Sequence, residues 1–222
     1  DVKISINSLD PTINQKIMTG IQNFPQLENI KAYLEHRDQF RKLGHYSTLT
    51  LQVTFHSSNL DTLPALVQWA MENGVDRVKG HHLWVTWPQL KSESLRQDRE
   101  SALLWNQRLQ EIHSLVETHP SKPSHFRLDN FLPLNLNHPE QIPDHYICPF
   151  LGQEAWIEAD GSFQICCCPA DKRKNFGDFG NASESSFTEL WESERYTNIL
   201  KQWGKHPNCQ VCNMRRPAQE VL

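Results

Sequence analysis

Four of the six cysteines in this chain are spaced as a metal-binding set. Cys148, Gly161 and Cys166 follow the pattern C-x12-G-x4-C, and Cys209 and Cys212 form a C-x-x-C pair close to the carboxyl terminus. Thiolates are the ligands that zinc and iron–sulfur clusters take in proteins. A C-x-x-C turn directs two sulfurs to one ion or cluster, and the distant pair completes the site. The sequence therefore predicts a four-thiolate metal site.

The spacing leaves both the third ligand and the metal open. Cys166, Cys167 and Cys168 are adjacent, and neighbouring residues on a strand point to opposite faces, so Cys166 and Cys168 can share a face. The Gly161-x4-Cys spacing selects Cys166, with Cys168 as the second candidate and Cys167 predicted to be a small buried residue. Zinc and iron–sulfur clusters use the same ligands, and thiol spacing alone favours structural zinc.

The composition excludes several other classes of function. The 222 residues carry a net charge of −4, so nucleic acid and anionic membranes are not expected partners. No apolar run approaches the ~18 residues of a membrane span, and no signal-peptide pattern is present. Six cysteines without a secretory signal favour metal or redox chemistry in the reducing cytoplasm over a disulfide framework.

The amino-terminal part alternates strand and helix patterns. Period-two alternation predicts strands, and apolar stripes ended by glycine predict helices. Asp10-Pro11 reads as a helix start, with Asp at the cap and Pro in the first turn. This order implies a parallel sheet with right-handed crossovers. The expected strands cover 2–7, 48–55 and 75–87, and the expected helices cover 10–44 (with breaks near Gly20 and Pro25), 61–73 and 92–118.

Each predicted strand keeps one polar face. This pattern fits a barrel-like sheet whose outer face packs on helices and whose inner face lines a wet cavity; the alternative is a half-exposed sheet with a solvated face. The segment 80–87, with two His and two Trp, would lie at the mouth of such a barrel, where substrates commonly bind. The candidates for the inner face are Ser5, Asn7, Gln52, Thr54, His56, His82 and Trp84.

The carboxyl-terminal part follows a different pattern. Residues 119–147 are rich in Pro, His and Asn and predict a surface linker, with solvated loop histidines. Two short antiparallel strands are then expected around the turn at Asp160-Gly161, because Asp-Gly supplies the positive φ of a tight hairpin. A helix should begin at the capping box of Ser186 and Glu189.

Several runs in this part resemble a known family. D-G-S-F-Q-I-C-C, F-G-D-F-G-N, S-F-T-E-L-W-E-S and C-x-x-C follow one another over residues 160–212. In this order they resemble the auxiliary-cluster domain, SPASM or its shorter twitch form, of radical S-adenosylmethionine enzymes. The resemblance implies that a 4Fe–4S cluster, in preference to zinc, is bound by Cys148, Cys166, Cys209 and Cys212. The further cysteines of the full domain are missing after Cys212, so one auxiliary cluster is expected.

The amino-terminal part resembles the same enzymes less specifically. The matching runs are I-S-I-N-S-L-D-P at 4–11, Gly20 and Phe24 with Asn29-Ile30, and the segment 59–76. The resemblance implies an α/β fold, in which residues 1–118 form the carboxyl-terminal half of a TIM-like parallel barrel. Residues 119–147 would be the linker, and 148–222 a small α+β cysteine-rich domain. Ser5 and Asn7 would lie near the ribose of S-adenosylmethionine.

The family's C-x-x-x-C-x-x-C motif, which holds the cluster that cleaves S-adenosylmethionine, occurs nowhere in this sequence. The sequence begins at Asp1 directly with a strand pattern, so we expect the carboxyl-terminal portion of a longer enzyme. By resemblance, that parent would bind S-adenosylmethionine and a second 4Fe–4S cluster, and would abstract hydrogen from a peptide or protein substrate. The missing half-barrel or another chain should cover the open sheet edge.

Two other functions fit the same residues. One is a non-catalytic binding module stabilised by a structural zinc ion on the four cysteines. The other is a degenerate, non-catalytic partner that uses its cluster to present a peptide.

Overall fold

The structure is a computed structural model that describes residues 1–20, 25–120, 122–202 and 204–218. The chain divides into two compact units, Asp1–Glu140 and Gln141–Leu222. Phe24, part of the amino-terminal resemblance, lies outside the described residues. Among the described helices, none combines the length and the apolar character that crossing a membrane requires.

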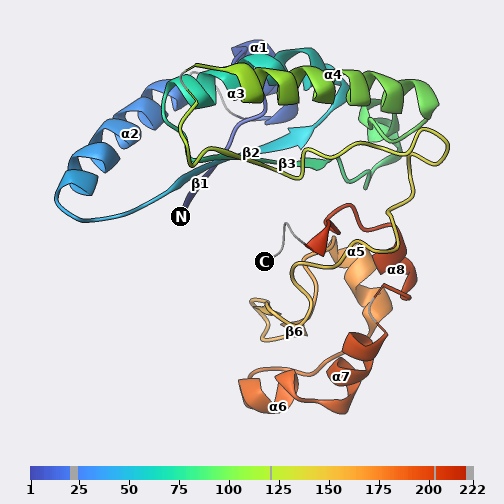
Figure 1. The fold of residues 1–222 in the computed structure, drawn as a ribbon. Coiled ribbons are helices and arrows are strands. Elements are labelled where there is room, and N and C mark those ends of the chain that lie inside the picture. Colours follow the sequence, from blue (N-terminus) through green and yellow to red (C-terminus); the bar gives the residue numbers. More distant parts are fainter. Residues whose placement is uncertain (21–24, 121, 203, 219–222) are drawn as a thin grey trace. The chain divides into compact units, whose positions relative to one another are not determined.

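The first unit is built on a parallel sheet of four strands in the order β1-β2-β3-β4. All its α-helices lie on one side of that sheet (Figure 1). This one-sided arrangement, together with a separate small antiparallel sheet, confirms the predicted α/β fold class. The strands are β1 (Val2–Ser5), β2 (Leu49–Phe55), β3 (Arg77–His82) and β4 (Arg127–Asp129); the helices are α1 (Pro11–Ile17), α2 (Gln26–Lys42), α3 (Leu63–Glu72) and α4 (Arg99–Thr118), with 3₁₀ turns η1 (Ser57–Thr62) and η2 (Pro88–Glu93).

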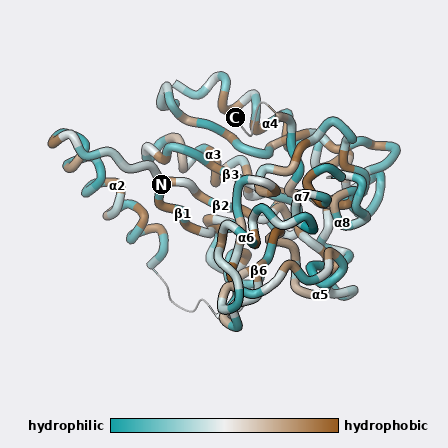
Figure 2. The backbone as a smooth tube through the Cα atoms, turned by 90° about the horizontal axis from the view of Figure 1, so that it is seen from below, coloured by the Kyte–Doolittle hydropathy of each residue, from teal (hydrophilic) through white to brown (hydrophobic). Residues whose placement is uncertain are grey.

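Local sequence signals set the helix boundaries. The Asp10 carboxylate accepts hydrogen bonds from the backbone N–H groups of Thr12 and Ile13, which confirms the predicted start of α1. Asp98 caps α4 in the same way through the N–H of Ser101. The tube of α2 alternates between hydrophilic and hydrophobic colours, as expected of a helix that buries one face (Figure 2).

The core of the first unit lies between the sheet and the helices. Alternate residues of β2 point to this side and are fully buried. At its centre the ring of Trp105 from α4 lies 4.4 Å from that of Phe55, and Phe131 packs on Phe55 at 4.9 Å. The buried residues of β2 on this face are Leu49, Leu51, Val53 and Phe55.

The end of the third strand differs from the prediction. β3 ends at His82 instead of residue 87, because Pro88 begins η2 and the preceding residues leave the sheet. His82 pairs with Phe55 in the parallel register and therefore shares its face. Its buried ring lies 4.9 Å from that of Trp105. The prediction that His82 faces an inner cavity is wrong, and His81 takes that face with Thr54.

The predicted linker over 119–147 contains part of the first unit. Strand β4 pairs with β3 there, and Phe126 and Phe131 on either side of it are buried in the core. The boundary between the two compact units falls after Glu140. This strand is only three residues long and lies in a proline-rich segment, so the sequence shows no alternating pattern that would predict it.

Gly80 in the middle of β3 is required by the packing of Phe55. A Cβ at position 80 would lie 1.8 Å from Cζ of Phe55, whose ring is held by Trp105. We expect Gly80→Ala to destabilise the first unit by about 3 kcal/mol, since overpacking displaces a fixed aromatic ring. Urea denaturation measures the loss. In a Phe55→Leu background the alanine should cost less; equal costs in both backgrounds would contradict this cause.

The second unit is small and stabilised by an aromatic cluster. The hairpin of β5 (Trp156–Ile157) and β6 (Phe163–Gln164) turns at Gly161, whose φ of 85° confirms the predicted tight turn. Ser186 and Glu189 form the predicted capping box of α6. Tyr196 is fully buried beside Phe163, Phe179 and Trp191. The helices of this unit are α5 (Ala170–Arg173), α6 (Phe187–Trp191), α7 (Glu194–Lys201) and α8 (Pro207–Gln210), with the 3₁₀ turn η3 (Lys174–Phe176).

Candidate metal centre

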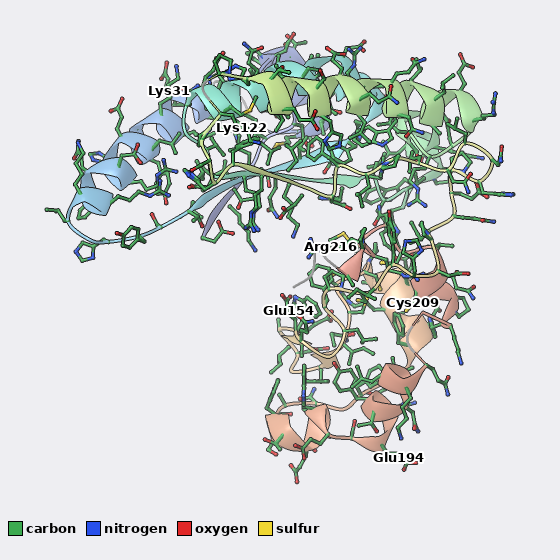
Figure 3. The ribbon with its side chains drawn as sticks, viewed as in Figure 1. Lys31, Lys122, Glu154, Glu194, Cys209 and Arg216 are labelled. Carbon is green, nitrogen blue, oxygen red and sulfur yellow. The ribbon has the colours of Figure 1, made fainter. Side chains whose placement is uncertain are left out.

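The C-x-x-C pair lies on a short helix and the turn that follows it. Cys209 belongs to α8, and the N–H of Cys212 donates to its carbonyl at 3.3 Å. His206 caps this helix by accepting a hydrogen bond from the N–H of Asn208 at 3.2 Å. The labelled Cys209 and Arg216 lie at the opposite end of the unit from Glu194 on α7 (Figure 3). We call residues 206–216 the knuckle.

The knuckle is tied to the segment that carries Cys148. Ile147 and Arg216 exchange two backbone hydrogen bonds of 2.9 and 3.1 Å, which form an antiparallel bridge. Arg215, buried with 5% of its surface exposed, adds side-chain bonds to the carbonyls of Tyr146 and Asp144 at 2.8 Å each. These contacts place Cys148 beside the C-x-x-C pair, although some 60 residues separate them in the sequence.

The other side of the knuckle holds the segment that follows Cys166. Asn208 donates to the carbonyl of Lys172 at 2.6 Å, and His206 lies 3.3 Å from the carbonyl of Asn175. The imidazole of His206 also stacks on Phe176 at 4.2 Å between ring centres. The knuckle, which carries Cys209 and Cys212, therefore contacts both the segment just before Cys148 and the segment that follows Cys166.

The thiols of the predicted site affect one another electrostatically. Burial, and after it the charges of the nearby Cys148, Cys166 and Cys209 thiolates, raise the pKa of Cys212 to about 12. Burial likewise raises the pKa of Cys148 and of Cys209, to which the charge of Cys166 adds. The ionised sulfurs of these cysteines therefore disfavour one another's charge, a repulsion that a bound cation would relieve.

Cys166 differs from its two neighbours. Hydrogen bonds from the Cys167 and Cys168 thiols lower the pKa of Cys166, while those two thiols have a raised pKa. The backbone N–H of Cys168 also donates to Sγ of Cys166 at 3.4 Å. Cys168 is buried, as a packing residue would be. Cys167 is exposed, so its predicted burial is wrong: the strand ends at Gln164 and strand alternation does not reach it.

The donor set fits an iron–sulfur cluster in chemistry. All six cysteines are free thiols, and Cys148, Cys166, Cys209 and Cys212 are each partly exposed. Beside Cys148 lies a cavity of about 210 Å³ lined by Ile147, Leu151 and Leu200. In the described part of the chain, no three His, Cys, Asp or Glu side chains stand in an arrangement that would hold a single metal ion.

The two residues predicted near S-adenosylmethionine lie at the carboxyl end of β1. Ser5 is exposed, and its carbonyl accepts a hydrogen bond from Gln26 at 2.5 Å. Asn7 is buried, and its side-chain oxygen accepts the N–H of Thr54 at 2.8 Å. The Asn7 side chain therefore joins β1 to the end of β2, which leaves Ser5 the more accessible of the two.

Sequence reasoning missed the residues that assemble the centre. Arg215 and Asn208 stand next to the C-x-x-C pair, but neither belongs to a metal-ligand pattern. The only available signal was their position, since polar side chains beside ligands commonly orient them. Their partners are backbone carbonyls, which no sequence pattern identifies.

Comparisons with known proteins agree with this site. Residues 148–213 match SPASM, an iron–sulfur cluster-binding domain. No curated protein matches the sequence. The crystal structure of Streptococcus suis SuiB bound to precursor peptide SuiA is 16% identical with a TM-score of 0.59, covering 96% of this chain and 46% of that one.

Two further SuiB structures give the same picture. SuiB by itself is 18% identical with a TM-score of 0.59, covering 96% of this chain and 48% of that one. SuiB bound to S-adenosylmethionine is 17% identical with a TM-score of 0.55, covering 95% and 48%. This chain therefore spans about half the length of SuiB. The predicted resemblance is confirmed: residues 148–213 match the SPASM iron–sulfur cluster-binding domain, and the chain has a fold similar to that of SuiB.

Proposed function

We propose that this chain binds one auxiliary 4Fe–4S cluster through Cys148, Cys166, Cys209 and Cys212. The observation that carries the proposal is the knuckle, which hydrogen-bonds to the segments of the other two proposed ligands and so supports a common site for thiols from three places in the sequence. The SPASM match over the same residues supports iron in preference to zinc. Such a cluster, when bound, can accept or pass on an electron or hold a substrate group.

We further propose that the chain is part of a radical S-adenosylmethionine enzyme that modifies a peptide or protein by hydrogen abstraction. SuiB, which shares the fold, has been crystallised with S-adenosylmethionine and with a precursor peptide. S-adenosylmethionine and a second 4Fe–4S cluster would be bound in the longer parent. Residues 1–118 would supply half of the barrel and 148–222 the cluster domain.

Within this proposal the first unit would contribute its polar sheet face to the binding of S-adenosylmethionine. Ser5 would lie near the ribose, and Asn7 would hold the end of β1 in place through Thr54. Strand β1 lies at the edge of the sheet, where the remaining strands of the parent or another chain would pair with it. Free thiols and an oxygen-sensitive cofactor suit the reducing cytoplasm.

Anaerobic reconstitution with iron and sulfide tests the cluster directly. We expect about four iron and four sulfide per chain, with broad absorption near ~400 nm from thiolate-bound iron. The double variant Cys209→Ala/Cys212→Ala should lose this absorption completely. One tightly held zinc ion and a colourless protein would instead identify a structural zinc module and refute the cluster.

A further inference from the structure

A cavity of about 360 Å³ lies at the amino end of the parallel sheet in the first unit. Its volume falls within the range of about 300–1,000 Å³ that small-molecule sites occupy. Thr50, Arg77 and Arg127 from its lining pair in one row across β2, β3 and β4, so their side chains share the polar face of the sheet. The other lining residues precede the strands and are Thr48, Asp76 and His125.

Part of this lining already binds a carboxylate, that of Asp1. The hydroxyls of Thr48 and Thr50 each donate to it at 3.0 Å, and the guanidinium of Arg77 donates at 2.7 Å. Arg77 is held in turn by the hydroxyl of Thr50 at 2.9 Å and the carboxylate of Asp129 at 3.1 Å. Thr50 is fully buried, so this donor is fixed in place. Hydroxyl and guanidinium donors are those that proteins use for carboxylate and phosphate groups.

The carboxylate of Asp76 also lines the cavity, but its charge is offset by other residues. It accepts hydrogen bonds from Arg37 at 2.6 Å and from Arg41 at 2.7 Å. The backbone N–H of Leu49 donates to it at 2.7 Å, and the imidazole of His125 approaches it at 3.0 Å. Two guanidinium groups on one carboxylate leave little negative charge to repel an anion in the cavity.

Arg127 differs from the other charged groups of the lining. Its side chain is exposed, and within the described part of the chain it forms no ion pair or hydrogen bond. Its backbone is fixed, because its N–H donates to the carbonyl of Asp76 at 3.2 Å. Lys3, which pairs with Thr50 in the register of β1 and β2, adds a further cation to the same row. This end of the polar face therefore offers positive charge to a ligand.

We propose that this cavity binds a small molecule that carries a phosphate or carboxylate group, with Arg127 as the residue that pairs with the anion. The anion would lie beside the carboxylate of Asp1 and share the donors of Thr48 and Arg77. Ser5 lies four residues further along the chain than Asp1, which is about 13 Å in a strand. The inference therefore concerns the opposite end of the strands from the proposed S-adenosylmethionine contact, and it does not depend on the cluster.

Calorimetric titration of the full chain at constant ionic strength tests the site. Inorganic phosphate and succinate are the two probes, and chloride is the reference anion. Amide shifts of Arg77 and Arg127 in two-dimensional NMR spectra locate the bound anion. The variants are Arg127→Gln, Arg127→Lys and Asp1→Asn, each checked for folding by circular dichroism. Arg99→Gln is the matched control, because Arg99 is an exposed arginine of the same unit that begins α4 on the helical side.

We expect the wild-type chain to bind at least one probe saturably at millimolar concentration. Arg127→Gln should weaken this binding roughly tenfold or more, since a charge-assisted hydrogen bond to the anion is lost. Arg127→Lys keeps the charge without the planar fork, so its affinity should lie between the two. Asp1→Asn should bind more tightly, because a neighbouring carboxylate is removed. Arg99→Gln should match the wild type. Opposite changes at Arg127 and Asp1 are not expected of residues that only stabilise the fold.

The two probes also identify the ligand. Binding of phosphate alone would support a phosphate-bearing molecule, and binding of succinate alone a carboxylate-bearing one. Saturable binding of neither probe would refute the site. Equal affinity in the wild type and folded Arg127→Gln would refute the pairing with Arg127, and unchanged or weaker binding in Asp1→Asn would refute an anion beside that carboxylate. The titrations require no bound cluster, so a negative result leaves the proposed cluster function untouched.

Discussion

Replacing Cys166 by serine is expected to reduce iron in the reconstituted chain from about four per chain to background, because a serine hydroxyl is a poor substitute for a thiolate ligand. The structure distinguishes Cys166 from its neighbours. Its sulfur accepts the N–H of Cys168, and its pKa is lowered by hydrogen bonds from the Cys167 and Cys168 thiols, so it is the one of the three that is readily a thiolate. Its charge also acts on Cys148 and Cys212.

The neighbouring cysteines provide matched controls. Cys167→Ser should retain the full iron content, since that side chain is exposed. Cys168→Ser should also retain iron, with some loss of stability, because the substitution places a polar hydroxyl at a buried position. Iron analysis and the visible spectrum of each variant show which of the three cysteines is the ligand. Loss of the cluster in Cys168→Ser with retention in Cys166→Ser would exchange the two assignments.

Asp76→Asn is expected to destabilise the first unit by about 3 kcal/mol, since it removes the buried one of the two carboxylates that pair with the buried Arg37, the other being the exposed Asp38. Asp76 accepts bonds from Arg37 at 2.6 Å and Arg41 at 2.7 Å, and from the N–H of Leu49 at 2.7 Å. His125 approaches the same carboxylate at 3.0 Å. The side chain of Arg37 is only 2% exposed, so water cannot replace the lost partner. Hydrogen exchange at the β2 amides reports the stability of this unit.

The effect of this substitution should depend on pH. Burial opposes ionisation of Asp76, but hydrogen bonds from Arg41 and Leu49 and the charge of Arg37 prevail and lower its pKa. The pKa of an aspartate in the unfolded chain is about 4. When folding lowers that pKa, the carboxylate stabilises the protein at pH values above about 4, and this stabilisation is lost as the pH falls from there towards the pKa of the folded state. The difference between wild type and Asp76→Asn should therefore be constant above about pH 5 and shrink below it.

Asp61→Asn is the control for a surface pair. Asp61 pairs with Arg108 at 2.5 Å, but its side chain is 84% exposed. Its replacement should cost less than ~1 kcal/mol, because solvent screens exposed ion pairs. Equal losses in the Asp61 and Asp76 variants would show that the network around Asp76 contributes nothing beyond a surface ion pair.

Periodic patterns in the sequence determined most of the secondary structure and its class. The alternation of β2, the Asp10 cap of α1, the Asp-Gly turn and the capping box at Ser186 all appear where they were predicted. These features depend on residues within a few positions of one another, and such local interactions can be read from one sequence. The cysteine spacing and the ordered runs around it predicted the match to the SPASM domain in the same way.

The tertiary structure decided the features that depend on contacts between distant residues. The face of His82 follows from its register with Phe55, and β4 forms only because its neighbour β3 accepts it. Arg215 donates hydrogen bonds to carbonyls about 70 positions away in the sequence. A side chain that bonds the backbone leaves no pattern in its partners, because every residue offers the same carbonyl. The sequence by itself therefore identified the candidate ligands, and the fold revealed what holds them together.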